Sequence, residues 1–244
     1  MRKVVLVTGG SSGIGEATVR LFASRGFNII LNYNKGEDRV SRIAKDIEDE
    51  YDISILPIKA DISDEVQVKN MVDKAIEVFG QIDVLVNNAG IAIDTDFSDK
   101  TVNNFRRILD VNLIGTFLVS KYVGEYMMKL GNGAIVNVGS TNGIDAYYTY
   151  SMDYDASKAG VHILTKDLAI QFAPNIRVNA VAPGWVKTPM NSELDKEYIE
   201  EEKAKITLER FADPVEIAKV IYFLASDEAS YVNGSIVVVD GGRK

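Results

Sequence analysis

The feature that most constrains the fold of this chain is a regular alternation of short apolar runs with longer amphipathic segments. The apolar runs are rich in β-branched residues, which favour strands, and they cover residues 3–8, 28–33, 54–60, 82–87, 134–138, 177–181 and 236–239. The segments between them repeat their apolar residues at helical spacing and cover 14–25, 38–50, 65–79, 102–130, 157–172 and 214–225. This alternation predicts βαβ units, and therefore an α/β fold with a parallel sheet covered by helices on both faces.

The organisation along the chain predicts a single domain over residues 1–244 with one excursion. We find no repeat, low-complexity tract or Pro/Gly/Ser-rich linker, and 244 residues suffice for one large α/β domain. The exception is the polar, acid-rich segment 185–208, which follows a predicted strand and contains Glu200-Glu201-Glu202. Because ligands of open α/β sheets bind outside the carboxyl ends of the strands, we expect this segment to form a helical lid over the site. A solvated surface excursion is the alternative.

Composition excludes several classes of function. A net charge of −8 argues against a nucleic acid or an anionic membrane surface as partner. No apolar run approaches about 18 residues, and the N-terminus does not resemble a signal peptide, so we expect a cytoplasmic protein. The absence of cysteine rules out disulfides and thiolate chemistry, and a single histidine, His162, leaves little room for a metal site or a Ser-His-Asp triad.

A glycine-rich loop follows the first predicted strand and opens the first predicted helix. Its sequence, Thr8-Gly9-Gly10-Ser11-Ser12-Gly13-Ile14-Gly15, has the spacing G-x-x-x-G-x-G. Glycine permits a tight turn and close approach of the backbone to a ligand, and a helix N-terminus favours an anion. Between a strand and a helix, the loop therefore predicts a site for the pyrophosphate of a dinucleotide cofactor.

Tyr154 and Lys158 are four residues apart in a segment with helical spacing, so they share one face of the expected helix. An ordinary tyrosine has a pKa near ~10, and a neighbouring cation favours the phenolate and lowers that pKa. The pair therefore predicts a tyrosine that acts as a general acid/base. Tyr147, Tyr148 and Tyr150 have no lysine four residues further on.

These motifs occur together with Asn87-Asn88-Ala89-Gly90, Asn112, Ser140, Pro183-Gly184 and Thr188, in a characteristic order. In this order and spacing the chain resembles the classical short-chain dehydrogenases/reductases over essentially its whole length. Among them it looks most similar to the 3-oxoacyl-[acyl-carrier-protein] reductases. The resemblance implies a Rossmann-type, doubly wound parallel sheet of about seven strands, and an enzyme that transfers a hydride between NAD(P)(H) and a carbonyl or alcohol.

The resemblance also implies roles for individual residues. Tyr154 would exchange the proton with the substrate oxygen, Lys158 would lower its pKa and hold the nicotinamide ribose, and Ser140 would hydrogen-bond the reacting oxygen. Asn112 would anchor a water between Lys158 and solvent. The implied cofactor-binding residues are Gly9, Ser11, Ser12, Gly13, Ile14, Gly15, Tyr33, Asn34, Lys35, Asp61, Ile62, Asn88, Ala89, Gly90, Tyr154, Lys158, Pro183, Gly184, Val186 and Thr188. For Asp61 a helix N-cap is an alternative role, and His162 is expected to pack in the core.

The end of the second strand indicates which dinucleotide is bound. An acidic residue there would bind the ribose 2′-hydroxyl and repel a 2′-phosphate, but this chain carries Tyr33, with Lys35 and Arg39 nearby. We therefore expect NADP(H). NAD(H) stays open, because Ser12 stands where many NADP-preferring members of the family have a basic residue.

The substrate is the least determined property. Tyr147, Tyr148, Trp185 and Met190 are expected to line an apolar and aromatic pocket, which suits a ketoacyl chain, a cyclic ketone or a sugar. The resemblance favours a 3-oxoacyl thioester, with an aldose or small-alcohol dehydrogenase as the alternative and a non-catalytic NADP(H)-binding sensor as a distant one. An acyl carrier protein would need a basic landing site, yet of the residues at 128–130 and 170–172 only Lys129 is basic. By resemblance we expect a homotetramer.

Overall fold

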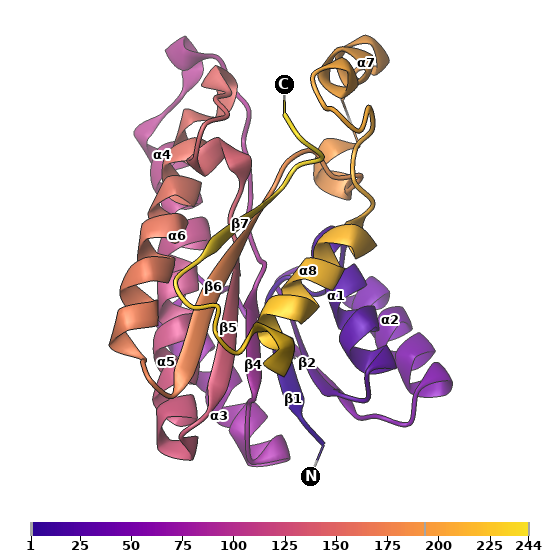
Figure 1. Cartoon of the computed structure of the whole chain (residues 1–244), viewed down its shortest axis with the longest axis vertical. Helices are drawn as coiled ribbons and strands as arrows, with labels where there is room; N and C mark the ends of the chain where they lie inside the picture. The colour runs from indigo at the N-terminus through magenta and orange to yellow at the C-terminus, as the bar shows by residue number, and fades with distance from the viewer. Residues whose placement is uncertain (1, 193, 244) are drawn as a thin grey trace.

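The computed structural model describes residues 2–192 and 194–243, and its centre is one seven-stranded parallel sheet (Figure 1). The strands run in the spatial order β3-β2-β1-β4-β5-β6-β7. Their bounds are β1 Val4–Val7, β2 Asn28–Tyr33, β3 Ile55–Lys59, β4 Val84–Asn87, β5 Gly133–Val138, β6 Ile176–Pro183 and β7 Ile236–Val239. Strand order reverses between β1 and β4, as in a doubly wound sheet, so the predicted fold is confirmed.

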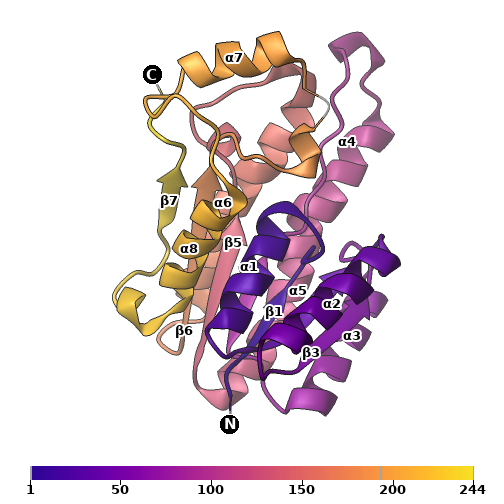
Figure 2. The ribbon, with the colours of Figure 1, turned by 90° about the vertical axis from the view of Figure 1, so that its right-hand side faces the viewer.

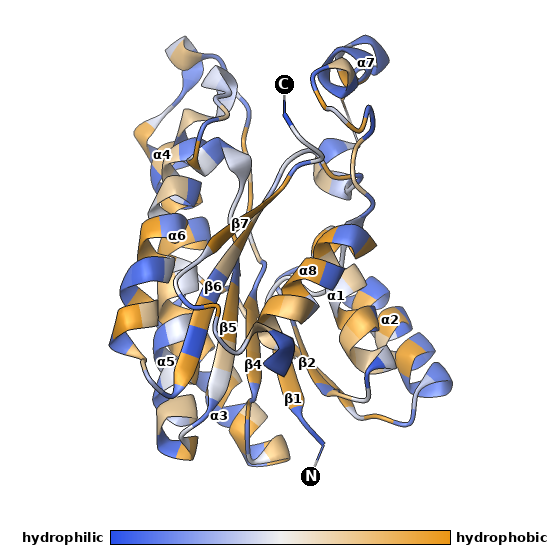
Figure 3. Cartoon of the chain, in the orientation of Figure 1, coloured by the Kyte–Doolittle hydropathy of each residue, from blue (hydrophilic) through white to orange (hydrophobic). Residues whose placement is uncertain are grey.

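Helices cover both faces of this sheet (Figures 1 and 2). On one face lie α1 (Gly13–Ser24), α2 (Glu37–Glu50) and α8 (Pro214–Ala225), and on the other α3 (Glu65–Phe79), α4 (Val102–Leu109), α5 (Gly115–Leu130) and α6 (Met152–Gln171). Alternate residues of a strand serve the two cores: in β1, Val5 and Val7 pack on the first face, and Val4 and Leu6 on the second. Colouring by hydropathy shows largely apolar central strands (Figure 3).

The ends of the helices follow local sequence signals. Asp64 caps α3 by accepting hydrogen bonds from the backbone N–H groups of Val66 and Gln67, and Gly80 ends that helix at a φ of 74°. Asp213 and Glu216 form a capping box at the start of α8, with Pro214 in its first turn. The N-cap of α3 is therefore Asp64, and the alternative role expected for Asp61 is not the one that the structure shows.

The structure differs from the sequence-based boundaries at two helices that carry site residues. The segment predicted as one helix over 102–130 contains a π-helical turn, Asp110–Ile114, between α4 and α5. Asn112 lies in this turn, and its side chain exchanges two hydrogen bonds with the backbone of Ile91 at 2.8 and 2.9 Å. Helix α6 begins at Met152 rather than at residue 157, so Tyr154 lies in its first turn.

Buried amides tie the sheet to the helices on one face. The Asn87 side chain donates hydrogen bonds of 2.9 Å to Asn137 and to Ser120, and Asn137 donates another of 2.9 Å to Thr165. This network joins β4, β5, α5 and α6 through groups that are no more than 4% exposed. Because buried polar groups need partners, such a network fixes the spacing of its elements as well as stabilising them.

All seven strands are parallel, so their carboxyl ends meet at one edge of the sheet. Helix α7 (Lys196–Ala204) lies beyond this edge, with the N-terminus of the chain at the opposite edge (Figure 2). None of the helices that the structure describes combines the length and apolar character needed to span a bilayer. The loops at the carboxyl edge are therefore the place to look for a functional site.

Candidate active site

A groove with a volume of about 310 Å³ runs along the carboxyl ends of the central strands. It brings together residues of the glycine loop, of the ends of β3 and β4, and of the segment that follows β6. Of the predicted cofactor residues, Gly9, Ser11, Ser12, Gly13, Ile14, Asn34, Asp61, Ile62, Asn88, Ala89, Gly90, Tyr154, Lys158, Pro183, Gly184, Val186 and Thr188 line it. Its lining therefore combines the residues of the glycine loop with residues from the ends of several strands, as a site for a dinucleotide requires.

The glycine loop is held by contacts that leave no room for larger residues. Gly9 has a φ of 61°, and a Cβ atom there would lie 2.9 Å from the Cα of Ala89. A Cβ on Gly15 would lie 2.2 Å from the carbonyl oxygen of Gly9. Asn88 ties the loop to β4 by donating from its side chain to the carbonyls of Thr8 and Gly9 at 3.0 and 3.1 Å. The loop therefore fits a dinucleotide pyrophosphate, which needs close backbone approach at a helix N-terminus.

Three predicted cofactor residues do not line the groove. Gly15 lies behind it, where its missing side chain lets the turn close on Gly9. Tyr33 is 7% exposed and packs in the core under α2, since alternation along β2 turns Asn32 and Asn34 to the groove instead. Lys35 is exposed on the loop beyond β2. These three residues do not line the groove, and their expected roles in cofactor binding stay predictions.

One end of the groove is closed by charged and polar side chains around Asp61. Its carboxylate accepts hydrogen bonds from Asn34 at 3.2 Å, from Arg107 at 2.9 Å and from the Ser63 hydroxyl at 2.6 Å. Partial burial opposes the charged form, but the bonds from Ser63 and Arg107 outweigh it and lower the pKa of Asp61 to about 2. Asp61 is therefore an anion matched to the Arg107 guanidinium at this end of the groove.

The four predicted catalytic residues come from three neighbouring elements. Ser140 follows β5, Tyr154 and Lys158 lie one turn apart on α6, and Asn112 lies in the π-helical turn. The Lys158 Nζ atom lies 5.5 Å from the centre of the Tyr154 ring. Asn112 donates to the Ser157 hydroxyl at 3.0 Å, and a Cβ on Gly90 would lie 3.3 Å from the Asn112 Oδ1 atom and 3.6 Å from the Lys158 Nζ atom. The fold thus gathers all four around Gly90 and the end of β5.

Protonation at this site differs from the expectation. Burial raises the pKa of Tyr154 to about 12, against an opposing hydrogen bond with Ser140, and burial lowers the pKa of Lys158 to about 8. Burial thus moves the pKa of Tyr154 in the direction opposite to the one expected from Lys158, whose role stays a prediction. The Lys158 ammonium lies over the ring and donates to the Val138 carbonyl at 2.7 Å, while desolvation dominates at the phenol.

The buried side chain of His162 contacts the backbone on both sides of the Ser140 turn. It is 5% exposed, its Nε2 atom accepts from the Ser140 backbone N–H at 3.4 Å, and its Nδ1 atom lies 3.3 Å from the Gly143 carbonyl oxygen. Burial lowers the pKa of its imidazole. The expected core histidine is confirmed, and it holds the backbone on both sides of the Ser140 turn.

A second cavity, of about 730 Å³, adjoins the groove on the side of α7. All four predicted pocket residues, Tyr147, Tyr148, Trp185 and Met190, line it. The groove and this cavity share the residues Ser140, Tyr154, Gly184, Met190 and Asn191. A molecule in the cavity would therefore meet a cofactor in the groove at Ser140 and Tyr154.

The segment 185–208 covers this second cavity. Trp185 stacks on Phe211 at 5.4 Å between ring centroids and donates from its indole to Glu202 on α7 at 2.8 Å. Past α7, Thr207 and Leu208 pair with the C-terminal end of the chain, and their N–H groups donate to the carbonyl oxygens of Gly242 and Gly241 at 2.7 and 3.1 Å. The segment 185–208 is thus held in place by the contacts of Trp185 and by its pairing with residues 241–243.

Sequence reasoning missed several lining residues. Arg107 reaches the groove only because α4 packs beside the end of β3, which no local pattern indicates. Asp94, Asp240 and Arg243 line the second cavity from distant parts of the chain. Tyr198 and Glu202, in contrast, carry a signal, since two residues four apart on the lid helix share one face.

Comparison with known proteins agrees with this geometry. The crystal structure of a short-chain type dehydrogenase/reductase from Mycobacterium marinum matches with a TM-score of 0.92 and 34% sequence identity, covering 98% of this chain and 94% of that one. A family model described as "Enoyl-(Acyl carrier protein) reductase" matches residues 9–244. The chain belongs to the short-chain dehydrogenase/reductase family. It is therefore an oxidoreductase that interconverts C–OH and C=O groups, and members of this family use a nicotinamide cofactor.

Curated relatives within the family have different substrates. The chain is 43% identical to the 3-oxoacyl-[acyl-carrier-protein] reductase FabG of Thermotoga maritima, over 98% of this chain and 97% of that protein. It is 41% identical to the cis-4-hydroxycyclohexanecarboxylate dehydrogenase of Sinomonas cyclohexanicum, over 98% and 96%. The resemblance inferred from the motifs is thus confirmed at the level of the family.

The lowered pKa of Lys158 predicts that this residue destabilises the folded chain. Its folded pKa of about 8 lies below the ordinary value, so the unfolded state binds more protons between about pH 8 and pH 10.4. Stability therefore rises with pH across that window, and the penalty is complete below it. Lys158→Met should stabilise the chain at pH 7 by an amount on the order of 3 kcal/mol, measured by chemical unfolding.

The matched control for this experiment is Lys166→Met, an exposed lysine on the same helix. It should change stability little at any pH. The gain from Lys158→Met should shrink when unfolding is repeated near pH 10, where the charge penalty on the folded state is largely gone. A gain of equal size at both pH values would contradict the assignment of the effect to the Lys158 charge.

Proposed function

We propose that the chain is an NADP(H)-dependent reductase of 3-oxoacyl thioesters. The observation that carries this proposal is the 43% identity, over nearly the full length of both chains, to the 3-oxoacyl-[acyl-carrier-protein] reductase of Thermotoga maritima. The relation of the two cavities supports it, because Ser140 and Tyr154 line both. The aromatic and apolar lining from Tyr147, Tyr148, Trp185 and Met190 offers a surface for the acyl part of the thioester.

Tyr154 acts in this proposal as the proton donor. A nicotinamide held in the groove would supply the hydride, and the carbonyl oxygen of the substrate would then need a proton. With a pKa raised to about 12, the phenol of Tyr154 is protonated at neutral pH, and an alkoxide is basic enough to take its proton. This protonation state favours the reductive direction.

Ser140 and Lys158 complete the environment of the reacting oxygen. The Ser140 hydroxyl hydrogen-bonds Tyr154 and lines the substrate cavity, so it can donate to the same oxygen as negative charge develops there. Lys158 lines the groove and would hold the nicotinamide ribose. Asn112 would act through its bonds to Ile91 and Ser157, which fix the strip beside Gly90 against α6.

An alcohol or aldose dehydrogenase is the second candidate. It is favoured by the 41% identity to the cis-4-hydroxycyclohexanecarboxylate dehydrogenase and by the polar part of the substrate cavity, where Asp94, Glu202, Lys205 and Arg243 could bind hydroxyl or carboxylate groups. A non-catalytic sensor ranks below both, because Asn112, Ser140, Tyr154 and Lys158 are all present and gathered at one place.

The test is NADPH oxidation at 340 nm with acetoacetyl-CoA, cyclic ketones and sugar lactones, and the reverse reaction with cyclic alcohols and aldoses. We expect turnover of the thioester. Tyr154→Phe should lower kcat by at least about 100-fold, since it removes the proton donor, while NADPH binding measured by fluorescence stays at its original strength. Oxidation of aldoses or cyclic alcohols with silence on the thioester would instead establish the second candidate.

A carrier protein is tested in the same assay by comparing acetoacetyl-CoA with the same acyl group on acyl carrier protein. Parent-like activity of Tyr154→Phe on any substrate would overturn the assigned role of this residue. Tight NADPH binding without turnover on the whole panel would overturn the reductase proposal and favour the sensor.

The preference for NADP(H) is supported by the end of β2. Residues 32–36 contain no carboxylate, and the nearby Glu37 lies 3.7 Å from Lys59. Asn34 lines the groove, and Lys35 follows it on an exposed turn. A 2′-phosphate placed at Asn34 would meet a cation at Lys35. The Asp61 carboxylate, which accepts a hydrogen bond from Asn34, is paired with Arg107.

Lys35→Ala should therefore weaken binding of NADPH by roughly 10-fold and leave binding of NADH nearly unchanged, because only the former carries the 2′-phosphate. Fluorescence titration of both cofactors provides the measurement. Lys45→Ala, an exposed lysine on α2, is the control for net charge. Equal losses for the two dinucleotides would show that Lys35 does not read the 2′-phosphate.

We also propose a homotetramer. Apolar side chains stand exposed on the outer face of α5, α6 and the π-helical turn, with Ile114 45%, Ile163 59% and Ile170 78% accessible. Covering such a face with a second copy removes apolar surface from water. Light scattering should then give four times the chain mass of 26.8 kDa, and a single-chain mass at micromolar concentration would contradict the proposal.

A further inference from the structure

A buried ion pair includes Asp153, the residue that precedes the proposed proton donor Tyr154. The Lys100 Nζ atom lies 2.9 and 3.0 Å from the two carboxylate oxygens of Asp153, and the two side chains are 4% and 0% exposed. Every other ion pair among residues 2–192 and 194–243 has at least one exposed partner. This pair therefore needs an explanation of its own.

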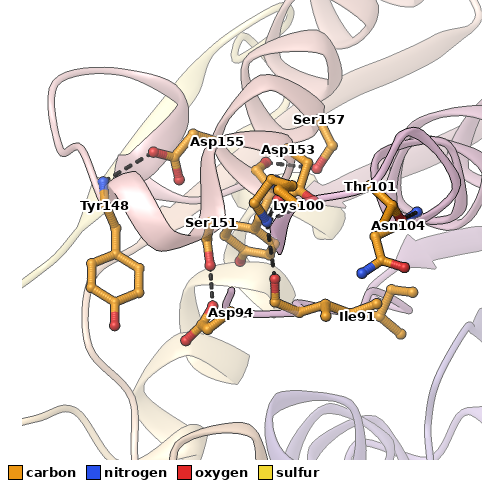
Figure 4. A network of polar contacts seen from close by, with 12 residues as sticks. Ile91, Asp94, Lys100, Thr101, Asn104, Tyr148, Ser151, Asp153, Asp155 and Ser157 are labelled. Atoms are coloured by element: carbon orange, nitrogen blue, oxygen red, sulfur yellow. Dashed lines mark hydrogen bonds and ion pairs between the residues drawn. The ribbon is translucent and has the colours of Figure 1, made fainter. Parts of the chain in front are cut away.

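The two partners belong to segments far apart in sequence. Lys100 ends the stretch 91–100, which leads from the strip at Gly90 to α4, and its ammonium also donates to the Ile93 carbonyl at 3.2 Å. Asp153 is in the first turn of α6, and its Oδ1 atom accepts the backbone N–H of Tyr154 at 3.1 Å. The Asp153 carboxylate thus bonds both the Lys100 ammonium, as Figure 4 shows, and the backbone N–H of Tyr154.

Further contacts link the same two segments. The Ser151 hydroxyl donates to the Asp94 carboxylate (Figure 4). The Thr95 N–H donates to the Tyr150 carbonyl at 3.1 Å. Ala92 and Asp94 line the substrate cavity, so the stretch 91–100 is one of its walls. The start of α6 and this wall are therefore joined as one unit.

A gain in folding stability does not explain why this ion pair is buried. Burying two charges costs several kcal/mol per ion, and replacing such a pair by apolar residues of similar size is often neutral or stabilising. Charged groups form hydrogen bonds with a preferred geometry. Lys100 donates to the Ile93 carbonyl and Asp153 accepts from the Tyr154 N–H, so the pair fixes the positions of both backbone groups. A misplacement of about 1 Å at a reacting group can cost roughly 100-fold in rate.

We propose that Lys100 and Asp153 are positioning residues, which hold the hydroxyl of Tyr154 in register with the wall of the substrate cavity. The inference rests on the proposed function, since it assigns the pair a task only if Tyr154 delivers the proton. Neither side chain lines the groove or the substrate cavity, so the pair acts through Tyr154 and the stretch 91–100.

The test compares Lys100→Met with the double variant Lys100→Met/Asp153→Asn in the full chain. The single variant leaves Asp153 buried without a partner, so both Tm and kcat should fall. The double variant contains no buried charge at this place, and the introduced amide keeps an oxygen to accept the Tyr154 N–H, so Tm should recover. Its kcat should remain roughly 10- to 100-fold below that of the unmodified chain, because the hydrogen bond from Lys100 to the Ile93 carbonyl is lost. Its affinity for NADPH should be unchanged.

Recovery of both Tm and kcat in the double variant would show that the pair only stabilises the fold, and would overturn the inference. If the double variant does not fold, Lys100→Arg keeps the charge but displaces the donors, and it should lower kcat while leaving the Kd of NADPH unchanged. A parent-like kcat in Lys100→Arg would equally contradict the assignment. The control pair is Lys69 and Asp73, exposed on α3, where Lys69→Met and Lys69→Met/Asp73→Asn should change neither quantity.

Failure of this inference is distinguishable from failure of the proposed function. The variants are assayed on the substrate of the panel that the unmodified chain turns over. Turnover of an alcohol or sugar in place of the thioester would reject the thioester proposal and still test the pair. If the unmodified chain turns over no substrate of the panel, the role of Tyr154 as a proton donor is rejected. The inference about Lys100 and Asp153 is then rejected as well.

Discussion

The parallel pairing of all seven strands is the constraint on which the rest of the molecule depends. It directs every strand end that carries a loop of the site to one edge of the sheet, and it forces the connections to cross over as helices on the two faces. The reversal of strand order between β1 and β4 then opens the groove at this edge, where the glycine loop and Asn88 meet. The candidate active site therefore lies where the fold leaves this opening.

Buried polar side chains connect the sheet and its helices to the candidate active site. Asn87 and Asn137 fix the sheet against α5 and α6, Asn112 holds the stretch after Gly90, and His162 supports the Ser140 turn. Each of these side chains is buried and bonded to an element other than its own. A buried hydrogen bond has a narrow range of good distances and angles, so these contacts set positions that apolar packing alone would leave adjustable.

The sequence predicted the fold well because its signals were local and repeated. Strand runs, helix periodicity and the glycine loop each depend on neighbouring residues, and the expected seven-stranded sheet follows from them. The clustering of Ser140, Tyr154 and Lys158 could also be predicted, since their motifs resemble those of a family. The single-domain organisation and the lid over 185–208 remain predictions, although the segment does cover the second cavity.

What could not be predicted depends on contacts between distant segments. The side chain of Asn112, in the π-helical turn, bonds the backbone of Ile91, and Arg107 enters the groove through the packing of α4. The pKa of Tyr154 was predicted from one charge–charge contact, whereas burial, a property of the whole fold, is the largest influence on the pKa values of both Tyr154 and Lys158. The spacing of residues in a sequence indicates which side chains lie near one another, but not how far they are buried from solvent.

The pairing of residues 241–243 with the end of the lid segment has a practical consequence for anyone who produces this protein. Material fused directly behind Arg243 would emerge beside the cover of the substrate cavity, whereas the N-terminus lies at the opposite edge of the sheet (Figures 1 and 2). An affinity tag or fluorescent label is therefore better attached at the amino end.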